Sequence, residues 1–147
     1  MAKLNYSMTV SVDTRNSTIH YLSMVGEDIA TVFKTLILSG DRAGYLVCVV
    51  PGNHEVNLKA AAKVSGNKKV EMLPMKELLP TTGYIRGGCS PIGMKKRFPT
   101  YIHQSCLEHE FIYISAGVRG LQIRIDPNDL IAYCSADVAD ISQPMGE

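Results

Sequence analysis

The chain has 147 residues, of which 46% are hydrophobic and 20% are charged, and its formal net charge is +1 at pH 7. This composition excludes an intrinsically disordered chain, and the small net charge excludes a protein that coats nucleic acid with a broadly basic surface. The length predicts a single domain, 1–147, with one hydrophobic core. No apolar run reaches the length of a membrane span, so we expect no membrane contact.

The first two predicted elements are a strand and a short helix. Met8–Val12 predicts a short edge strand. Ser17 or Thr18 is suited to cap a short helix that runs to Val25, and Gly26 follows where such a helix would end.

Two apolar strands come next. Val32–Leu38 is apolar except for Lys34 and Thr35, and Tyr45–Val50 is apolar on both faces, which predicts a central strand. Gly40 followed by aspartate marks the turn between the two strands.

The middle of the chain combines two short helices with a strand. Asn57–Ser65 predicts an amphipathic helix that ends at Gly66. The predicted buried face consists of Leu58, Ala61, Ala62 and Ser65, with Lys59 and Lys63 facing water. Lys69–Leu73 predicts a short strand, and Pro74 begins a second helix that runs to Leu79, because proline is tolerated in the first turn.

The last third of the chain holds the clearest pair of strands. Phe111–Ser115 and Leu121–Ile125 are joined by Ala116–Gly120, and in the second strand Gln122 and Arg124 point away from the aliphatic residues. The flanking predicted elements are a strand, Phe98–His103, and a helix, Pro127–Tyr133, capped by Asp126. Helices and strands mix without strict β-α-β alternation, so we expect an α+β fold with a mixed, curved sheet.

The segment Thr82–Lys96 is the most distinctive part of the sequence. It contains Pro91 and four glycines, which are Gly83, Gly87, Gly88 and Gly93, yet it keeps aromatic and aliphatic residues. Glycine lets a backbone approach a ligand closely, and Lys95 and Lys96 favour an anionic ligand. The alternative is a tight corner of the sheet followed by solvated lysines.

Lys34 is the strongest single candidate for chemistry. It lies within Val-Phe-Lys-Thr-Leu-Ile-Leu, where a buried amine would be costly unless it were paired or neutral. Such an amine suits a carbonyl or a phosphate. The alternative is a lysine at a strand end whose ammonium reaches solvent.

Other reactive residues form weaker patterns. His103, Cys106 and His109 share a spacing that could bring ligands together, but structural zinc takes four ligands and no fourth is apparent. Cys89 and Ser90 could act as nucleophiles, but no paired base, Ser-His-Asp pattern or phosphate-binding loop is recognisable. We therefore expect no metal and no cofactor.

The cysteines and the N-terminus indicate a compartment. Cys48, Cys89, Cys106 and Cys134 are widely spaced without a Cys-x-x-Cys motif, which favours reduced thiols. The first residues lack the apolar segment of a signal peptide. We expect a cytoplasmic protein.

Four ordered motifs resemble the YbaK/EbsC family, which groups with trans-editing domains related to the insertion domain of bacterial prolyl-tRNA synthetase. The motifs lie at 33–36, 68–72, 82–96 and 115–123, and the match runs from about Gly26 to Tyr133. The resemblance implies a barrel-like mixed sheet flanked by helices. Family members usually begin with a full helix, and because only seven residues precede Met8 we expect that helix to be shortened.

The resemblance also implies an aminoacyl-tRNA deacylase, most typically for Cys-tRNA(Pro). Lys34 matches the family's key lysine and is the predicted catalytic residue. The predicted substrate-binding residues are Thr35, Gly87, Gly88, Cys89, Ser90, Pro91, Ser115 and Gly117. The nucleophile can be the terminal ribose hydroxyl, a water or the cysteine thiol of the substrate, so the protein's main task would be positioning.

The implied partners are the 3′ aminoacyl end of a mischarged tRNA and prolyl-tRNA synthetase. Two alternatives stay open at this point. The chain could be a non-catalytic module that binds aminoacyl-tRNA or a nucleotide, or it could be a deacylase for Ala-tRNA or Ser-tRNA. The oligomeric state is not indicated by the sequence.

Overall fold

The structure is a computed structural model that describes residues 9–11, 18–21, 29–85, 88–94, 96–118 and 121–146, with side chains from residue 29 onward. Its helices are α1 (Leu58–Ser65), α2 (Met75–Thr82) and α3 (Pro127–Cys134), with short 3₁₀ turns at Ile29–Thr31 and Gln104–Glu108. None of the described helices is long and apolar enough to cross a membrane.

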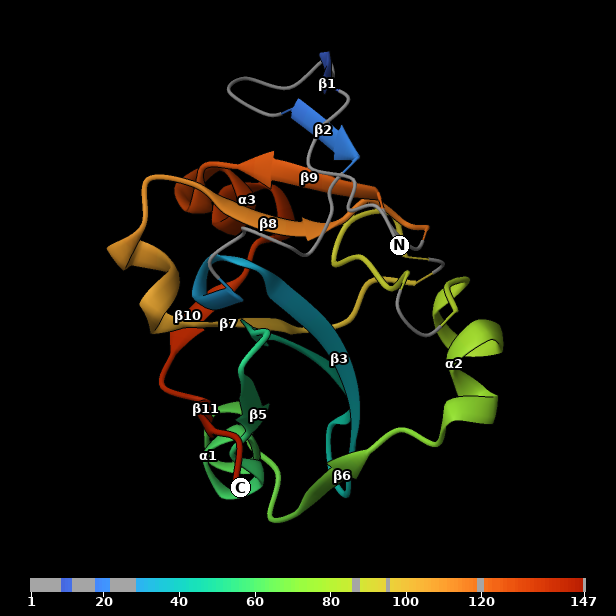
Figure 1. The fold of residues 1–147 in the computed structure, drawn as a ribbon. Helices are drawn as coiled ribbons and strands as arrows, with labels where there is room; N and C mark the ends of the chain where they lie inside the picture. Colours follow the sequence, from blue (N-terminus) through green and yellow to red (C-terminus); the bar gives the residue numbers. More distant parts are fainter. Residues whose placement is uncertain are drawn as a thin grey trace.

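The strands form two larger sheets and a small one (Figure 1). The strands are β1 (Thr9–Ser11), β2 (Thr18–Tyr21), β3 (Phe33–Gly40), β4 (Gly44–Pro51), β5 (His54–Val56), β6 (Val70–Met72), β7 (Thr100–His103), β8 (Ile112–Ser115), β9 (Leu121–Ile125), β10 (Asp137–Ala139) and β11 (Ser142–Pro144). Their orders are β10-β7-β4-β3-β6, β1-β2-β9-β8 and β11-β5.

The predicted α+β class with a mixed sheet is confirmed. β7 runs parallel to both β4 and β10, whereas β3 runs antiparallel to β4 and β6. The two larger sheets meet where Val32, just before β3, is bridged in parallel to Tyr113 of β8. Among the described residues this bridge is the backbone pairing that connects the two larger sheets. The barrel-like closure of the sheet stays a prediction.

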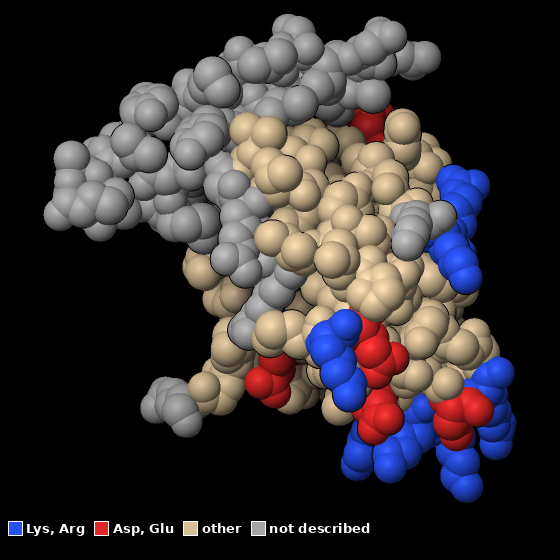
Figure 2. All heavy atoms as spheres, turned by 90° about the vertical axis from the view of Figure 1, so that its right-hand side faces the viewer, with Lys and Arg blue, Asp and Glu red and all other residues tan. Residues whose placement is uncertain are grey.

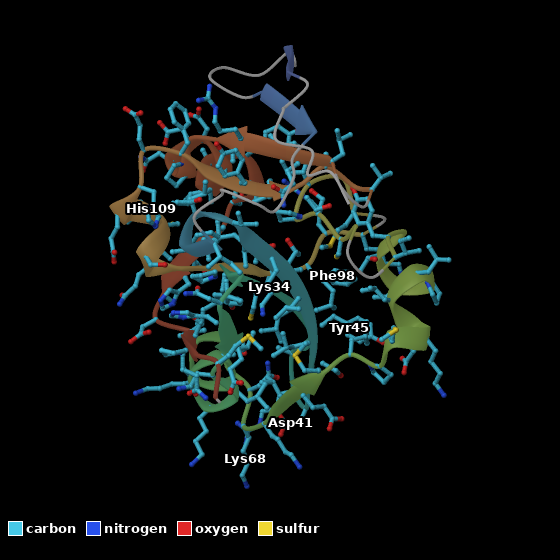
Figure 3. All side chains as sticks on the ribbon, in the orientation of Figure 1. Lys34, Asp41, Tyr45, Lys68, Phe98 and His109 are labelled. Carbon is cyan, nitrogen blue, oxygen red and sulfur yellow. The ribbon has the colours of Figure 1, made fainter. Side chains whose placement is uncertain are left out.

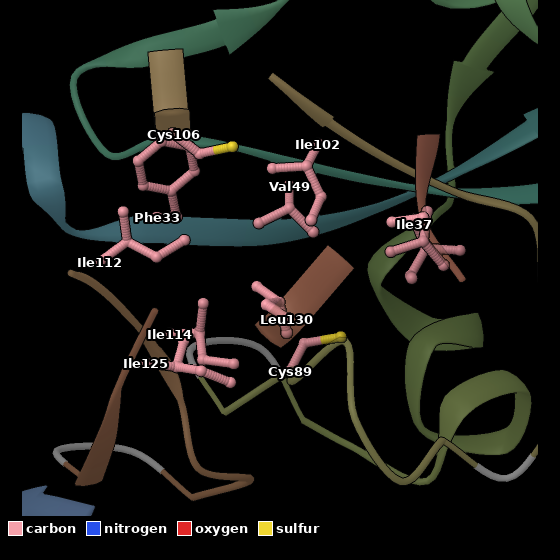
Figure 4. Packing of buried hydrophobic residues seen from close by; sticks show 12 residues of the cluster. Phe33, Ile37, Val49, Cys89, Ile102, Cys106, Ile112, Ile114, Ile125 and Leu130 are labelled. Carbon is pink, nitrogen blue, oxygen red and sulfur yellow. The ribbon is translucent and has the colours of Figure 1, made fainter. Parts of the chain in front are cut away.

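Two hydrophobic clusters lie on opposite faces of the five-stranded sheet. The first fills the space between this sheet, β8, β9 and α3, and it includes Phe33, Val49 and Leu130 (Figure 4). The second lies between the same sheet and α1, and it includes Leu38 and Val50. Alternation along β3 and β4 therefore supplies both clusters, as the two-sided apolar pattern predicts.

The sequence locates most elements to within a few residues. The predicted edge strand, the two apolar strands, the β8–β9 pair and the three later helices are all present. Side-chain caps begin two of the three helices: in α1 the Asn57 side chain accepts from the Ala60 amide at 3.1 Å, and in α3 the Asp126 carboxylate accepts from the Asn128 amide at 2.8 Å. Gly66 ends α1 with a left-handed φ of 76°.

Two expectations are wrong. The helix predicted from Ser17 or Thr18 to Val25 is replaced at 18–21 by strand β2, which pairs antiparallel with β9. Thr-Ile-His-Tyr is rich in β-branched and aromatic residues, and the open edge of β9 outweighs a local capping preference. In α1, Leu58 is 42% exposed, because the helix packs through Ala61 and Ala62 and Leu58 is its first residue. The shortened N-terminal helix and residues 22–25 lie outside the described residues.

Candidate active site

A cavity of about 600 Å³ opens beside one edge of β3. On that edge the described part of β8 forms a β-bridge only at Val32, and β6 pairs with β3 only from Leu38 to Gly40. No described strand pairs with the edge between these points, so residues 32–37 line the cavity. The other walls are Met72, Leu73, Met75, Leu78, Cys89, Ser115 and Gln122. This volume is typical of small-molecule sites.

Two acceptor atoms in the wall lack a partner. The Thr35 hydroxyl oxygen and the Gln122 side-chain amide oxygen are buried and make no hydrogen bond with any described residue. Thr35 is only 8% exposed. Leaving such a group unpaired costs about 1–3 kcal/mol, and a ligand that donates hydrogen bonds would remove this cost. An ammonium group is such a ligand.

The strand register brings three polar residues to one face. Because Val32 lies opposite Tyr113 in a parallel bridge, Lys34 and Ser115, two residues further on, lie on a common face. Gln122 lies opposite Ser115 in the β8–β9 pair and shares this face. Thr35 points to the other face of β3, as strand alternation predicts. A cavity at a strand edge can be lined from both faces.

Lys34 lies at the centre of the molecule, whereas Lys68 extends from its lower end (Figure 3). The Lys34 side chain is half-buried, and its Nζ donates to the Gly52 carbonyl at 3.4 Å. Burial lowers the pKa of the Lys34 amine from its ordinary value of 10.5, and the negative charge of Glu55 opposes this shift. The amine is therefore partly desolvated and forms no ion pair with a described residue, which leaves it available to a ligand.

The glycine-rich loop after α2 contributes Cys89 to the cavity wall. The Gly88 amide donates to the Ile85 carbonyl at 3.0 Å, whereas the amides of Cys89 and Ser90 have no acceptor among the described residues. The Ser90 hydroxyl is used inside the loop, where it accepts from the Ile92 amide at 3.2 Å. The loop therefore has two backbone donors for a ligand.

Cys89 is poorly suited to act as a nucleophile. It is 7% exposed, and burial raises the pKa of its thiol to about 11, although a hydrogen bond with Thr82 acts in the opposite direction. A thiol with such a pKa is protonated at neutral pH, and the thiolate is the reactive form. The burial of the thiol argues against nucleophilic attack by Cys89, and its role in substrate binding stays a prediction.

The predicted site residues are only partly brought together. Lys34, Thr35, Cys89 and Ser115 line the cavity. Gly88, Ser90, Pro91 and Gly117 do not, and Gly87 lies outside the described residues. The Gly117 amide donates to the Ser115 hydroxyl at 3.2 Å, and its φ of 101° requires glycine.

Sequence reasoning missed Gln122 and Tyr84. A glutamine on the polar side of an alternating strand predicts a solvent-facing residue, and no local pattern shows that the cavity covers it. Tyr84 donates its hydroxyl hydrogen to the Ile92 carbonyl at 2.5 Å, and its ring lies directly against Gly117. It thereby ties the glycine-rich loop to the segment after β8.

The candidate metal ligands do not converge. Cys106 is fully buried in the first hydrophobic cluster, and the His103 Nδ1 accepts from the Ile141 amide at 3.3 Å. His109 lies at the far left edge of Figure 3. No group of three or more His, Cys, Asp or Glu in the described part of the chain has metal-binding geometry.

Comparison with known proteins gives consistent matches. Residues 16–133 match the aminoacyl-tRNA editing domain family. The Enterococcus faecalis protein assigned as Cys-tRNA(Pro)/Cys-tRNA(Cys) deacylase EbsC is 50% identical over 118 residues, which are 80% of this chain and 72% of that protein. The proline–tRNA ligase of Thermosipho melanesiensis is 31% identical over 86 residues, covering 58% of this chain and 14% of the ligase.

The fold agrees with these matches. A crystal structure assigned as a trans-editing enzyme for prolyl-tRNA synthetase superposes with a TM-score of 0.75 at 25% identity, over 81% of this chain and 74% of that one. The motifs that resemble the YbaK/EbsC family all lie within the matched residues. The family match covers most of the sequence and half of the aligned residues are identical to EbsC, so this chain belongs to the aminoacyl-tRNA editing domain family.

Proposed function

We propose that the protein is an aminoacyl-tRNA deacylase that hydrolyses mischarged tRNA, with Cys-tRNA(Pro) as its main substrate. The observation that carries this proposal is that Thr35 and Gln122 bring buried acceptors with no partner among the described residues to a cavity that the Lys34 side chain also lines. The α-ammonium group of an aminoacyl ester donates hydrogen bonds and would satisfy both acceptors. The 3′ end of a tRNA that carries no amino acid has no such ammonium group.

The reaction needs little chemistry from the protein. Water adds to the ester carbonyl, the bond to the ribose oxygen breaks, and the products are a free amino acid and a tRNA with its terminal hydroxyl restored. The Lys34 ammonium and the amide of Cys89, both from residues that line the cavity, are the donors that would stabilise the negative carbonyl oxygen. The attacking group can be a water, or first the neighbouring ribose hydroxyl or the substrate's own thiol.

The cavity wall favours a soft, apolar side chain on the substrate. Met72, Leu73, Met75 and Leu78 offer sulfur and aliphatic surface, which a thiol can contact without losing strong hydrogen bonds. A serine hydroxyl in the same place would be left without a hydrogen-bond partner, whereas an alanine side chain would fill less of the cavity. Selection of cysteine over serine therefore rests on polarity, and selection over alanine rests on contact area.

The relatives suggest how the substrate arrives. EbsC is assigned to Cys-tRNA(Pro) and Cys-tRNA(Cys), and the structural neighbour is assigned to prolyl-tRNA synthetase. We propose that this chain also receives its substrate from, or together with, that synthetase. A cavity that encloses only the aminoacyl end cannot by itself identify a tRNA.

A deacylation panel tests the proposal. Purified protein is mixed with Cys-tRNA(Pro), Ala-tRNA(Pro), Ser-tRNA and correctly charged Pro-tRNA(Pro), with and without prolyl-tRNA synthetase, and ester loss is followed against spontaneous hydrolysis. We expect the fastest loss with Cys-tRNA(Pro). Protection of the ester in place of cleavage would instead identify a binding module, and preference for Ala or Ser would assign a different editing specificity.

A further inference from the structure

A second, smaller cavity lies on the other side of the glycine-rich loop. Its volume is about 190 Å³, below the range of whole small-molecule sites but enough for part of a nucleotide. We call it the basic pocket, and its walls are Pro91, Ile92, Gly93, Met94, Lys96, Arg97, Phe98, Thr100, Tyr133 and Cys134. None of these residues except Pro91 belongs to the predicted site.

The basic pocket is bordered by two cations, Lys96 and Arg97. Lys96 and Arg97 are exposed, and neither forms an ion pair with a described residue. The Arg97 charge acts on the pocket wall, since it opposes the rise in the pKa of Cys134 to about 11 that burial causes. Elsewhere, on the face in Figure 2, most basic side chains gather at the lower end among acidic ones. Unpaired cations beside a cavity favour a phosphate.

Aromatic surface adjoins these cations. Tyr133 on α3 is 56% exposed although it is an aromatic residue. Phe98 is held in place by Tyr45, whose ring it meets edge-on at a centroid distance of 5.6 Å (Figure 3). A basic wall with an accessible aromatic ring is the pattern that binds single-stranded nucleic acid, because bases stack on rings and phosphates contact cations.

The basic pocket adjoins the candidate active site. Cys89 lines the large cavity and Pro91 lines the basic pocket, so a single residue, Ser90, separates the two in the loop, and their Cα atoms are at most about 7 Å apart. One extended nucleotide can bridge such a distance. The loop is fixed from the pocket side, where the Cys134 thiol donates to the Pro91 carbonyl at 3.6 Å.

We propose that the basic pocket binds the tRNA nucleotide that precedes the aminoacylated adenosine, with Lys96 and Arg97 on its phosphates and Tyr133 against its base. This inference rests on the proposed function, because it needs the aminoacyl adenosine in the large cavity. The pocket would then hold the single-stranded 3′ end in register while the loop presents its amides to the ester.

Two substrates of different length test this assignment. The double variant Lys96→Gln, Arg97→Gln is compared with the control Lys59→Gln, Lys63→Gln, which removes the same charge from the exposed face of α1. With Cys-tRNA(Pro), we expect kcat/KM to fall at least about tenfold in the first variant and less than about twofold in the control. With cysteinyl-adenosine, which lacks the preceding nucleotide, both variants should match the wild type.

Two further readouts sharpen the test. The pocket variant should flatten the plot of log(kcat/KM) against log[salt] by about 0.7 for each phosphate that it no longer neutralises. Tyr133→Ala should lower kcat/KM for the tRNA substrate about five- to a hundredfold, as expected when one base can no longer stack. It should leave cleavage of cysteinyl-adenosine unchanged.

Several outcomes would overturn the inference. If the pocket variant behaves like the control with the tRNA substrate, or loses equal activity on both substrates, the pocket does not bind the preceding nucleotide. If the wild type cleaves neither substrate, the proposed function has failed, and fluorescence anisotropy with a labelled RNA tetranucleotide, ACCA, tests the pocket separately. Equal binding by the pocket and control variants would then contradict it, and selective loss of binding would support it.

Discussion

Lys34 and Thr35 are neighbours in sequence but serve the cavity from opposite faces of β3. This is feasible because the cavity lies at a stretch of strand edge with which no described strand pairs, where both faces and the backbone border the same space. Lys34 brings a partly desolvated amine, and Thr35 brings a buried acceptor. A site of this kind depends on individual side chains, so single substitutions should separate activity from stability.

Replacing Lys34 should remove activity and preserve the fold. We expect Lys34→Ala to lower kcat for Cys-tRNA(Pro) at least about a hundredfold, or about 2.7 kcal/mol, because the ester carbonyl loses its cation. Its unfolding free energy should change little, since the half-buried amine has no ion pair with a described residue. Lys34→Arg should not restore the full rate, because guanidinium is larger and planar. Wild-type turnover by Lys34→Ala would contradict the assignment.

Thr35→Val should make the protein more stable and less active. The substitution removes a buried hydroxyl that has no hydrogen-bond partner among the described residues, so the unfolding free energy should rise by about 1 kcal/mol. Activity should fall at least about tenfold, because the substrate ammonium loses an acceptor. Thr100→Val is the matched control for stability: the Thr100 hydroxyl donates to the Phe98 carbonyl at 3.0 Å, so its removal should be destabilising. Urea denaturation and deacylation assays measure both effects, and destabilisation by Thr35→Val would count against the site.

At the scale of elements, the last strands are held by a histidine pair. His103 at the end of β7 is 6% exposed, and its ring centroid lies 5.6 Å from that of His54 in β5. The His54 Nδ1 lies 2.7 Å from the Ser142 hydroxyl of β11, and the His103 Nδ1 accepts from the Ile141 amide. These contacts join β5, β7 and β11 through two imidazole rings.

This corner should weaken in acid. Burial lowers the pKa of His103 from its ordinary value of 6.5, and His54 lowers it further, whereas Asp140 and Glu108 raise it. The unfolded chain therefore binds the proton more readily than the folded chain. The contribution of His103 to the unfolding free energy is present in full above about pH 6.5 and declines as the pH falls below that value. Urea midpoints between pH 5 and pH 8 measure this. His103→Gln should show a flatter pH dependence, and an unchanged slope would exclude His103 as the cause.

At the scale of the whole molecule, one sheet joins the two hydrophobic clusters. β3 places Phe33 and Ile37 in the first cluster and Leu38 in the second, and β4 alternates in the same way. Loss of packing on one face of this sheet should therefore disturb the other face. The two clusters should behave as one cooperative unit, in keeping with the proposal that 1–147 is a single domain.

Denaturation should accordingly show a single transition. Tyrosine fluorescence and far-UV circular dichroism should give the same urea midpoint, because the tyrosines lie in several elements and the chain has no tryptophan. A clear separation between the two curves would indicate two independently folding parts and would contradict the single domain.

The α+β class, the central strands, the ends of α1 and α3 and the family could be predicted from the sequence, because they depend on local periodicity, caps and ordered motifs, whereas α2 continues past the predicted end at Leu79 to Thr82. It also identified Lys34, Thr35, Cys89 and Ser115, which line the cavity. Three features appear only in the three-dimensional structure: Thr18–Tyr21 pairs as a strand, Gln122 lines a cavity, and Lys96 and Arg97 border a second cavity. These features depend on which strand edge stays open and which distant segments meet there, and long-range pairing overrides the preferences of short segments.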